Sequence, residues 1–403
     1  MTSGLFSCGT SSTLTVNVTR YMALSRSSIN SGLGATENGE HQIVGSAGTI
    51  ENLYAELGTA PGSGNTVTIT LRVNGADTAL TCQIANTNTQ ATDTSNSVTV
   101  AAGDRINYKV VTSAANSAAS LRVSSQYVGD TANESLILGS TGGVQMDSSG
   151  DFYLPPSGHV CTKSLTTDAN ARMLCPTAGT IKKFYMWLDT APGGATSRKF
   201  EIYKNNAATG VTMTISGAST TGNDTSNTVA VSAGDLISIK LTNTGAFPAG
   251  ALGAWGFVLT ATTDGDFPVF GGTNVDPNTA AARYAPLFLQ ASSDWDTSDV
   301  RFMCGQTGTI KNLYVAMTTA PAAGKSWAVA VRNNSSDVLT ATVADAATTG
   351  NASGTVSVAN YDNLSLGVTP TGTPTAPVDF YWGVNMSLTA AATAFEPVTS
   401  WFL

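Results

Sequence analysis

Apolar and polar residues alternate strictly along several short stretches of this chain, most clearly in TVTITLRVN at residues 66–74. Every second position there holds a large apolar residue, namely Val67, Ile69, Leu71 and Val73. A period of two places these side chains on one face, so the stretch predicts a half-buried β-strand. The Asn74-Gly75 pair that follows is typical of the positive-φ turn of a tight hairpin.

The same strand and turn occur twice more at a nearly constant distance. Phe200 and Val329 take the place of Ile69, first 131 and then 129 residues further along the chain. The matching turns are expected at Asn205-Asn206 and Asn333-Asn334. A period of about 130 residues is too long for a solenoid unit and long enough for a domain with its own core.

A second phrase repeats in the same register, as SAGTIENLYAELGTAPGSG at 46–64, TAGTIKKFYMWLDTAPGG at 177–194 and QTGTIKNLYVAMTTAPAAG at 306–324. We therefore expect three tandem domains, at 21–135, 136–268 and 269–403, preceded by an N-terminal arm or strand at 1–20. Each copy contains about eight short strands and no clear helical periodicity, which predicts an all-β antiparallel β-sandwich. A jelly roll is favoured over an immunoglobulin-like sandwich, because the Cys…Trp…Cys pattern is missing.

The strand at 180–188 has two different faces. Alternation directs Phe184, Met186 and Leu188 toward the core, and Ile181, Lys183, Tyr185 and Trp187 to the other side. A tyrosine recurs on that outer face in every copy, as Tyr54, Tyr185 and Tyr314. Either the same domain covers these rings, or they lie at an interface between domains or subunits, where an amphipathic ring contributes much contact area.

The five cysteines are Cys8, Cys82, Cys161, Cys175 and Cys304, without any CxxC spacing. Cys175 and Cys304 hold the position that Val44 holds in the first copy. A cysteine that exchanges with valine is typical of a small buried apolar residue, rather than of a metal ligand or a disulfide partner.

The composition of the chain argues against some classes of protein function. The chain has 403 residues, 11% of them charged, a net charge of −8 and no cluster of Lys or Arg. Nucleic-acid binding is not expected, because it depends on localised positive charge. No apolar run reaches the roughly 20 residues of a membrane helix. The N-terminus also lacks the features of a signal peptide, so we expect cytoplasmic synthesis and no membrane insertion.

No catalytic constellation is recognisable, since GxSxG, HExxH, Walker and Rossmann motifs are all missing. His41 and His159 have no neighbours at ligand spacing and are expected in surface loops. We therefore expect no enzyme activity, no cofactor and no dedicated metal site. The one acidic cluster, SDWDTSDV, offers a candidate ion or ligand loop formed by Asp294, Trp295, Asp296 and Asp299, because calcium binds several oxygens.

The pattern AGTI..LY…TAPG…NG…DTSN…V.VAAGD resembles a repeat in structural proteins of tailed bacteriophages and related viral sequences. It covers 47–111 and 178–241 well and 307–368 more loosely, where ANYDN replaces AGD. The resemblance implies a virion component built from jelly-roll-like modules, and it carries over no catalytic residue.

Two functions follow from this resemblance. The first is a non-enzymatic structural protein of the virion surface, a capsid decoration or cement protein made in the host cytoplasm. Its partners would be the major capsid protein or tail components, together with further copies of itself. The alternative is a tail-fibre or head-fibre adhesin that binds host glycans, with Trp187, Trp255 and Trp295 as candidate contacts and avidity from repeated sites. A glycan depolymerase is not expected, because no paired acid and base is present.

Overall fold

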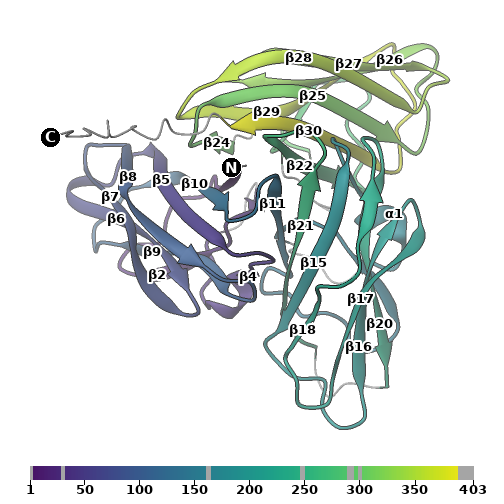
Figure 1. The fold of residues 1–403 in the computed structure, drawn as a ribbon. Helices are drawn as coiled ribbons and strands as arrows, with labels where there is room; N and C mark the ends of the chain where they lie inside the picture. The colour runs from purple at the N-terminus through teal and green to yellow at the C-terminus, as the bar shows by residue number, and fades with distance from the viewer. Residues whose placement is uncertain are drawn as a thin grey trace, which may run out of the picture.

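The computed structural model describes residues 3–28, 32–159, 165–245, 250–287, 295–297 and 302–388. Within them the chain is almost entirely β-strand, which confirms the predicted all-β class. Six antiparallel-rich sheets form three pairs, and each pair is a β-sandwich. The three sandwiches lie at the corners of a triangle, so that each one borders both of the others (Figure 1).

The first domain is built from ten strands and one short 3-10 helix. Its strands are β1 (Ser3–Thr10), β2 (Thr19–Met22), β3 (Ser27–Ser28), β4 (Gln42–Ile43), β5 (Gly48–Thr59), β6 (Gly62–Val73), β7 (Ala76–Asn86), β8 (Gln90–Val100), β9 (Arg105–Thr112) and β10 (Ala119–Gly129), with η1 at Asn38–Glu40. One sheet has the order β3-β1-β10-β5-β8, and the other has the order β2-β9-β6-β7 with β4 beside β9. The N-terminal strand β1 pairs with β10 and so belongs to this sandwich.

The second domain repeats this plan. Its elements are β11 (Glu134–Ser140), β12 (Asp151–Leu154), β13 (Gly158–His159), α1 (Asp168–Ala171), β14 (Met173–Leu174), β15 (Gly179–Leu188), β16 (Ser197–Lys204), β17 (Ala207–Ser216), β18 (Thr221–Asp224), β19 (Val229–Val231), β20 (Leu236–Thr244) and β21 (Gly253–Ala261). One sheet has the order β13-β11-β21-β15-β18 with β19 beside β15. The other has the order β12-β20-β16-β17 with β14 beside β20.

The third domain has the same two sheets. Its strands are β22 (Asp266–Thr273), β23 (Arg283–Ala285), β24 (Phe302–Cys304), β25 (Gly308–Met317), β26 (Ala322–Asn333), β27 (Ser336–Asp345), β28 (Thr349–Val358), β29 (Asp362–Thr371) and β30 (Phe380–Leu388). The orders are β22-β30-β25-β28 and β23-β29-β26-β27, with β24 beside β29. The second and third sandwiches therefore begin at Glu134 and Asp266, slightly before the expected 136 and 269.

The alternating stretch that predicted a strand forms most of β6. Its apolar face enters the core, where Val67, Ile69 and Leu71 are fully buried, as are Phe200 and Val329 in the other copies. The hairpin turn is formed by Asn74 and Gly75 at φ values of 52° and 81°. In the third copy the turn consists of Asn334 and Ser335, at 49° and 72°, one residue later than expected.

The AGD segment acts as a turn, as its composition suggested, whereas the DTSN segment of the first copy lies within β8, where the register against β5 shifts between Glu51 and Leu53. Asp93 Oδ1 accepts hydrogen bonds from the backbone N–H groups of Ser95 and Asn96, and its Oδ2 accepts one from Thr81 N. In the same way, Asp104 accepts a hydrogen bond from Ala101 N. These carboxylates accept hydrogen bonds from N–H groups that the ladder leaves unpaired, which fixes the geometry of the bulge and of the turn.

The assignment of faces on the strand at 180–188 is partly wrong. Phe184, Met186 and Leu188 lie in the core, but Ile181 lies there too. The cause is a bulge in which Lys183 adopts a φ of 53° and the register against β21 shifts between Lys182 and Tyr185. The extra residue reverses the alternation on its N-terminal side, so residues before and after it reach the core together.

The cysteines behave as the exchange with valine predicted. Cys175 and Cys304 are fully buried in the cores of their domains. Burial raises the pKa of each thiol to about 12. Four of the five cysteines are described, all without a disulfide, whereas Cys161 lies outside the described residues.

Candidate functional site

The candidate functional sites in the described part of the chain are the junctions between the domains. In each of them, one short strand of a domain packs on the first sheet of the next domain. β4 of the first domain lies against β11 and β21, β14 of the second lies against β22 and β30, and β24 of the third lies against β1 and β10. These contacts run head to tail and return to their start, so the domains form a closed ring.

Apolar residues from one domain complete the core of another in the same cyclic order. Leu136 and Leu138, on β11 of the second domain, belong to the core of the first. Phe270, on β22 of the third domain, belongs to the core of the second. Leu5, on β1 of the first domain, belongs to the core of the third. Burial of side chains of this size stabilises each junction by about 1.5–3 kcal/mol per residue.

Two glycines allow the backbones to meet. A Cβ at Gly256 would lie 1.9 Å from the carbonyl oxygen of Ile43, and a Cβ at Gly383 would lie 2.6 Å from that of Leu174. The equivalent residue of the first domain is Ser124, whose Oγ accepts a hydrogen bond of 3.2 Å from Gly305 N of the third domain. The third junction therefore replaces a close backbone approach by a hydrogen bond.

The three tyrosines singled out from the sequence each lie beside a neighbouring domain. Tyr185 packs with Ile43 of the first domain. Tyr314 lines a hollow of about 260 Å³ together with Leu174 and Gly234 of the second. Tyr54 contacts the third domain: its hydroxyl accepts a hydrogen bond of 2.9 Å from Asn360 Nδ2.

The departure of the third copy from AGD has a structural counterpart at the Tyr54 junction. Gly103 and Gly234 occupy this turn position in the first two copies, with φ values of 92° and 96°. Tyr361 replaces them at a φ of 68°, a conformation that is costly for a residue with a Cβ. Its ring meets the ring of Tyr54 edge-on, with centroids 5.3 Å apart. Packing between the first and third domains offsets the backbone cost.

A buried carboxylate marks the junction of the first and second domains. Glu134 Oε2 accepts a hydrogen bond of 2.6 Å from Ser46 Oγ of the first domain. Lys183 and Lys182 contact the Oε1 atom at 2.8 and 2.9 Å. Burial raises the pKa of Glu134, but hydrogen bonds from Lys183, Ser46 and Lys182 outweigh it, so the pKa lies below its usual value. The group stays ionised and holds both domains.

Asp266 occupies the corresponding place between the second and third domains. It accepts hydrogen bonds from Thr177 Oγ1 of the second domain at 2.9 Å and from Lys311 Nζ at 2.8 Å. The first copy has Ser3 in place of the carboxylate and Glu51 in place of the lysine. The third junction consequently lacks this ion pair and depends on the Tyr54–Tyr361 contact and on Ser124 instead.

The expectation that both histidines lie in surface loops is wrong. His159 of the second domain is buried and contacts Glu40 of the first at 2.9 Å, beside the Arg26–Glu40 pair. Burial raises the pKa of Glu40, but the charges of His159 and Arg26 lower it further, to about 2. Burial, followed by the charge of Arg105, lowers the pKa of His41 to about 4. Sequence spacing gave no signal, because the partners belong to different domains.

The tryptophans proposed as glycan contacts are buried. Trp255 lies in the second core, and Trp187 lies under the ring of His41 at the first junction. Trp295 lies in the third core and donates a hydrogen bond of 2.8 Å to Val275 O. None of the three offers a free ring face for a sugar.

The acidic loop is only partly described. Asp294 and Asp299 lie outside the described residues, and the backbone of Asp296 pairs with Tyr284. Within the described ranges, no group of three or more His, Cys, Asp or Glu side chains is arranged to hold a metal ion.

A second repeated tyrosine escaped the sequence interpretation, although its spacing was a usable signal. Tyr21, Tyr153 and Tyr284 stand at the same register of β2, β12 and β23, on the outer face of the second sheet. Each ring is half-buried under a cation, with Arg72 at 5.9 Å, Lys240 at 6.0 Å and Arg332 at 4.7 Å from the respective ring centroid. Each domain thus repeats an aromatic–cation pair at its surface.

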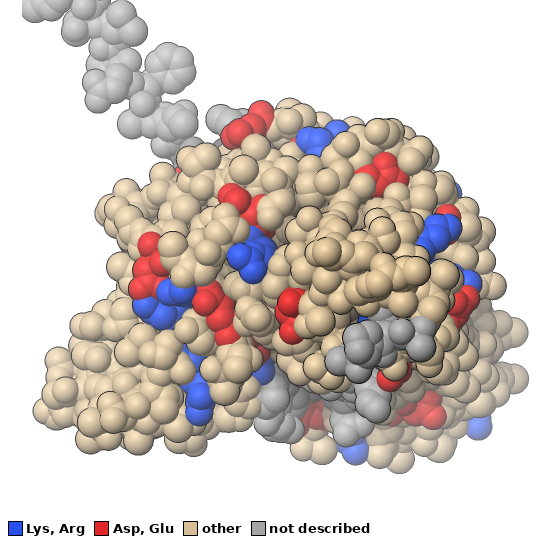
Figure 2. Space-filling view, turned by 90° about the horizontal axis from the view of Figure 1, so that it is seen from below, with Lys and Arg blue, Asp and Glu red and all other residues tan. Residues whose placement is uncertain are grey.

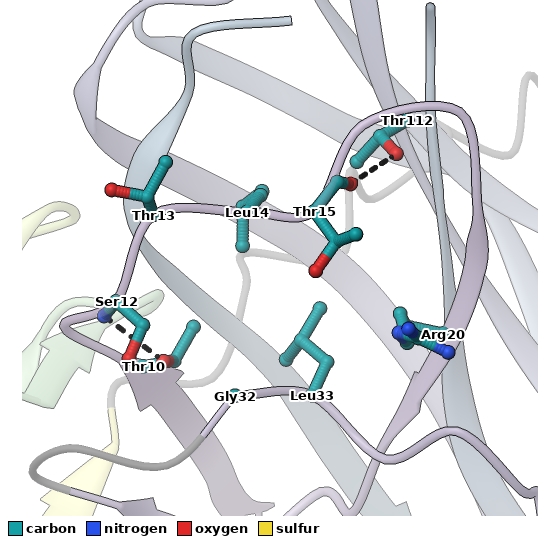
Figure 3. Close-up of a pocket in the computed structure, with 9 residues that line it drawn as sticks. All are labelled: Thr10, Ser12, Thr13, Leu14, Thr15, Arg20, Gly32, Leu33 and Thr112. Atoms are coloured by element: carbon teal, nitrogen blue, oxygen red, sulfur yellow. Dashed lines mark hydrogen bonds between the residues drawn. The ribbon is translucent and has the colours of Figure 1, made fainter.

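Hollows in the described residues include three of about 110, 260 and 310 Å³. The hollow of about 110 Å³ is bordered by threonine and serine side chains, Leu14, Leu33 and Arg20, and Figure 3 shows these lining residues. Thr112 Oγ1 donates a hydrogen bond of 2.7 Å to Thr15 O at its edge. Ligand pockets usually enclose roughly 300–1,000 Å³, and the residues that line this one contain no acid–base pair.

Charge is distributed thinly over the surface. On the face shown in Figure 2, basic and acidic residues lie singly or side by side within wide neutral areas. No helix in the described part of the chain has the length and apolar character required to cross a membrane. No protein-family model matches the chain, and no curated protein is significantly similar to it.

Proposed function

We propose that this chain is a non-enzymatic structural protein of a bacteriophage virion surface, with capsid decoration as its main role. The observation that carries the proposal is the closed ring, in which three similar sandwiches share cores and buried polar contacts in cyclic order. Such a ring is a rigid unit with three similar faces. It suits a position where three coat subunits meet, because each domain then faces a similar environment.

The strand pairings support the jelly-roll assignment. The first long strand pairs with the last, β1 with β10, and the pairs β2–β9, β5–β8 and β6–β7 are nested inside it. Consecutive strands β1 and β2 lie in different sheets. In an immunoglobulin-like sandwich the first two strands share a sheet, whereas nested pairing is expected when one long hairpin wraps into two Greek keys.

Location and copy number test the decoration role. Purified particles of the virus that encodes the chain should contain it in a fixed ratio to the major coat protein, and a particle map should show its three lobes on the shell. Its absence from particles, or its confinement to the tail, would overturn the role.

The adhesin alternative retains one supporting observation, the aromatic–cation pair that recurs at Tyr21, Tyr153 and Tyr284. Three weak surface sites in one rigid chain can gain avidity of roughly 10²–10⁴ over a single site. On a glycan array, replacing one of these tyrosines by alanine should weaken binding and replacing all three should abolish it. An array without signal for the unaltered chain would exclude this function.

A further inference from the structure

One carboxylate in the third domain holds an amine and a carboxamide at the same time. Asp266 Oδ1 accepts a hydrogen bond of 2.8 Å from Lys311 Nζ, and its Oδ2 accepts one of 2.7 Å from Asn385 Nδ2. Asp266 lies on β22 and Lys311 on β25, with β30 between them. The lysine chain therefore crosses β30, the strand that carries Asn385, and its amine contacts the same carboxylate as that carboxamide.

Two of the three groups are buried, whereas the Lys311 side chain is 32% exposed. Asp266 is 4% exposed and Asn385 is 2% exposed. Thr177 of the second domain covers the carboxylate and donates a hydrogen bond to it. Asn385 Oδ1 is buried and has no hydrogen-bond partner among the described residues. An unpaired buried carbonyl oxygen costs about 1–3 kcal/mol, so its retention calls for a reason.

We propose that Lys311 and Asn385 form an isopeptide bond, with Asp266 as the proton carrier. Asp266 accepts a proton from the Lys311 ammonium group along the hydrogen bond that joins them. The free amine Nζ then attacks Asn385 Cγ, and Asp266 passes two protons to the departing Nδ2, the one it has accepted and a second one from the attacking nitrogen, so that it ends as a carboxylate again. The new C–N bond forms, the Cγ–Nδ2 bond breaks, and ammonia leaves as an ammonium ion. No oxidant or co-reactant is needed.

The other two copies provide natural comparisons. The second copy has the same amine and carboxylate, with Lys182 at the position of Lys311 and 2.9 Å from Glu134, but Val258 replaces the carboxamide. The equivalence follows from register, because Val258 pairs with the first strand of its domain as Asn385 does. The first copy has no lysine there. All three groups occur together in the third copy alone among these equivalent positions.

The mass of the full chain tests the bond. Under denaturing conditions, the intact protein should be lighter than its sequence by one ammonia molecule. Trypsin should fail to cut after Lys311, and peptide mapping should find a branched peptide that joins Lys311 to Asn385. An intact mass equal to that of the sequence would overturn the proposal.

Matched variants separate this bond from other losses of ammonia. Lys311→Arg keeps the positive charge beside Asp266 but removes the primary amine, so this variant should have its full sequence mass. Lys182→Arg alters the equivalent lysine of the second domain and should still lose ammonia. Succinimide formation at Asn38-Gly39 or Asn74-Gly75 also releases ammonia. Persistence of the loss in Lys311→Arg would assign it to such a site and overturn the bond.

Discussion

The carbonyl oxygen of Ile43 in the first domain lies directly over Gly256 in the second, where a Cβ would be only 1.9 Å away. Gly256→Ala should therefore force the two domains apart. Overpacking of this kind costs about 1–3 kcal/mol. Chemical unfolding should show the loss, and small-angle scattering should show a larger particle.

A control variant at Ser124, the equivalent residue of the third junction, separates the effect of a steric clash from the effect of lost hydrogen bonds. Ser124→Ala keeps a Cβ and removes the hydroxyl, so it should cost only about 1 kcal/mol for the lost hydrogen bonds. Equal effects of Gly256→Ala and Ser124→Ala would contradict the role of the close approach.

The Tyr54–Tyr361 contact should be measurable as a coupling energy. Replacement of each ring by alanine, singly and together, forms a double-mutant cycle. We expect a coupling of about 0.5–1.5 kcal/mol, because the rings meet edge-on. Tyr314 lies beside Gly234 rather than beside an aromatic ring, so a cycle between Tyr314 and Tyr361 should give none. Additive effects of Tyr54→Ala and Tyr361→Ala would rule out a ring contact in solution.

Leu136 belongs to the second domain in sequence and to the core of the first in space. Leu136→Ala should cost about 2–5 kcal/mol and should lower hydrogen-exchange protection in β10 of the first domain. Phe200→Ala, deep in the second core, should instead lower protection within β16 and β20. Protection lost only within the second domain after Leu136→Ala would show that the domains do not share a core.

Acid should loosen the junction of the first and second domains through His41. Its pKa falls from 6.5 to about 4 on folding. Between these values the unfolded chain binds more protons, so the free energy of unfolding falls as the pH decreases from 6.5 toward 4. The contribution is about 3 kcal/mol. His41→Gln cannot titrate, so the difference in stability between pH 7 and pH 4.5 should shrink in that variant. An unchanged difference would refute this contribution.

Local patterns predicted the parts of the fold that depend on neighbours in sequence. Alternation identified the buried face around Ile69, and asparagine and glycine identified the hairpin turns. The bulge at Lys183 was not predicted, since a lysine at a φ of 53° gives no sequence signal. Because the bulge was not anticipated, strict alternation assigned Ile181 to the outer face, whereas its side chain lies in the core.

The burial of residues that are covered by a neighbouring domain could not be predicted from the sequence of a single copy of the repeat. His41 directly follows the short 3-10 helix and His159 ends the two-residue strand β13, and both are buried because another domain covers them. In contrast, Tyr21, Tyr153 and Tyr284 recur at the spacing of the repeat, so the sequence did contain a signal for these residues. Tyr361 replaces a glycine of the repeat for a reason that is visible only where the first and third domains meet.

In the described part of the chain, two corners of the ring are joined by continuous backbone, through residues 130–133 and 262–265. The remaining corner joins the first and third domains by side-chain and backbone contacts between described residues. The order of the three domains along the chain is thus one of three orders that could form the same closed ring. A circular permutant that opens the chain at 130–133 and links Leu388 to Ser3 with a comparably short connector should reach the same arrangement, because every junction already exists without regard to where translation starts.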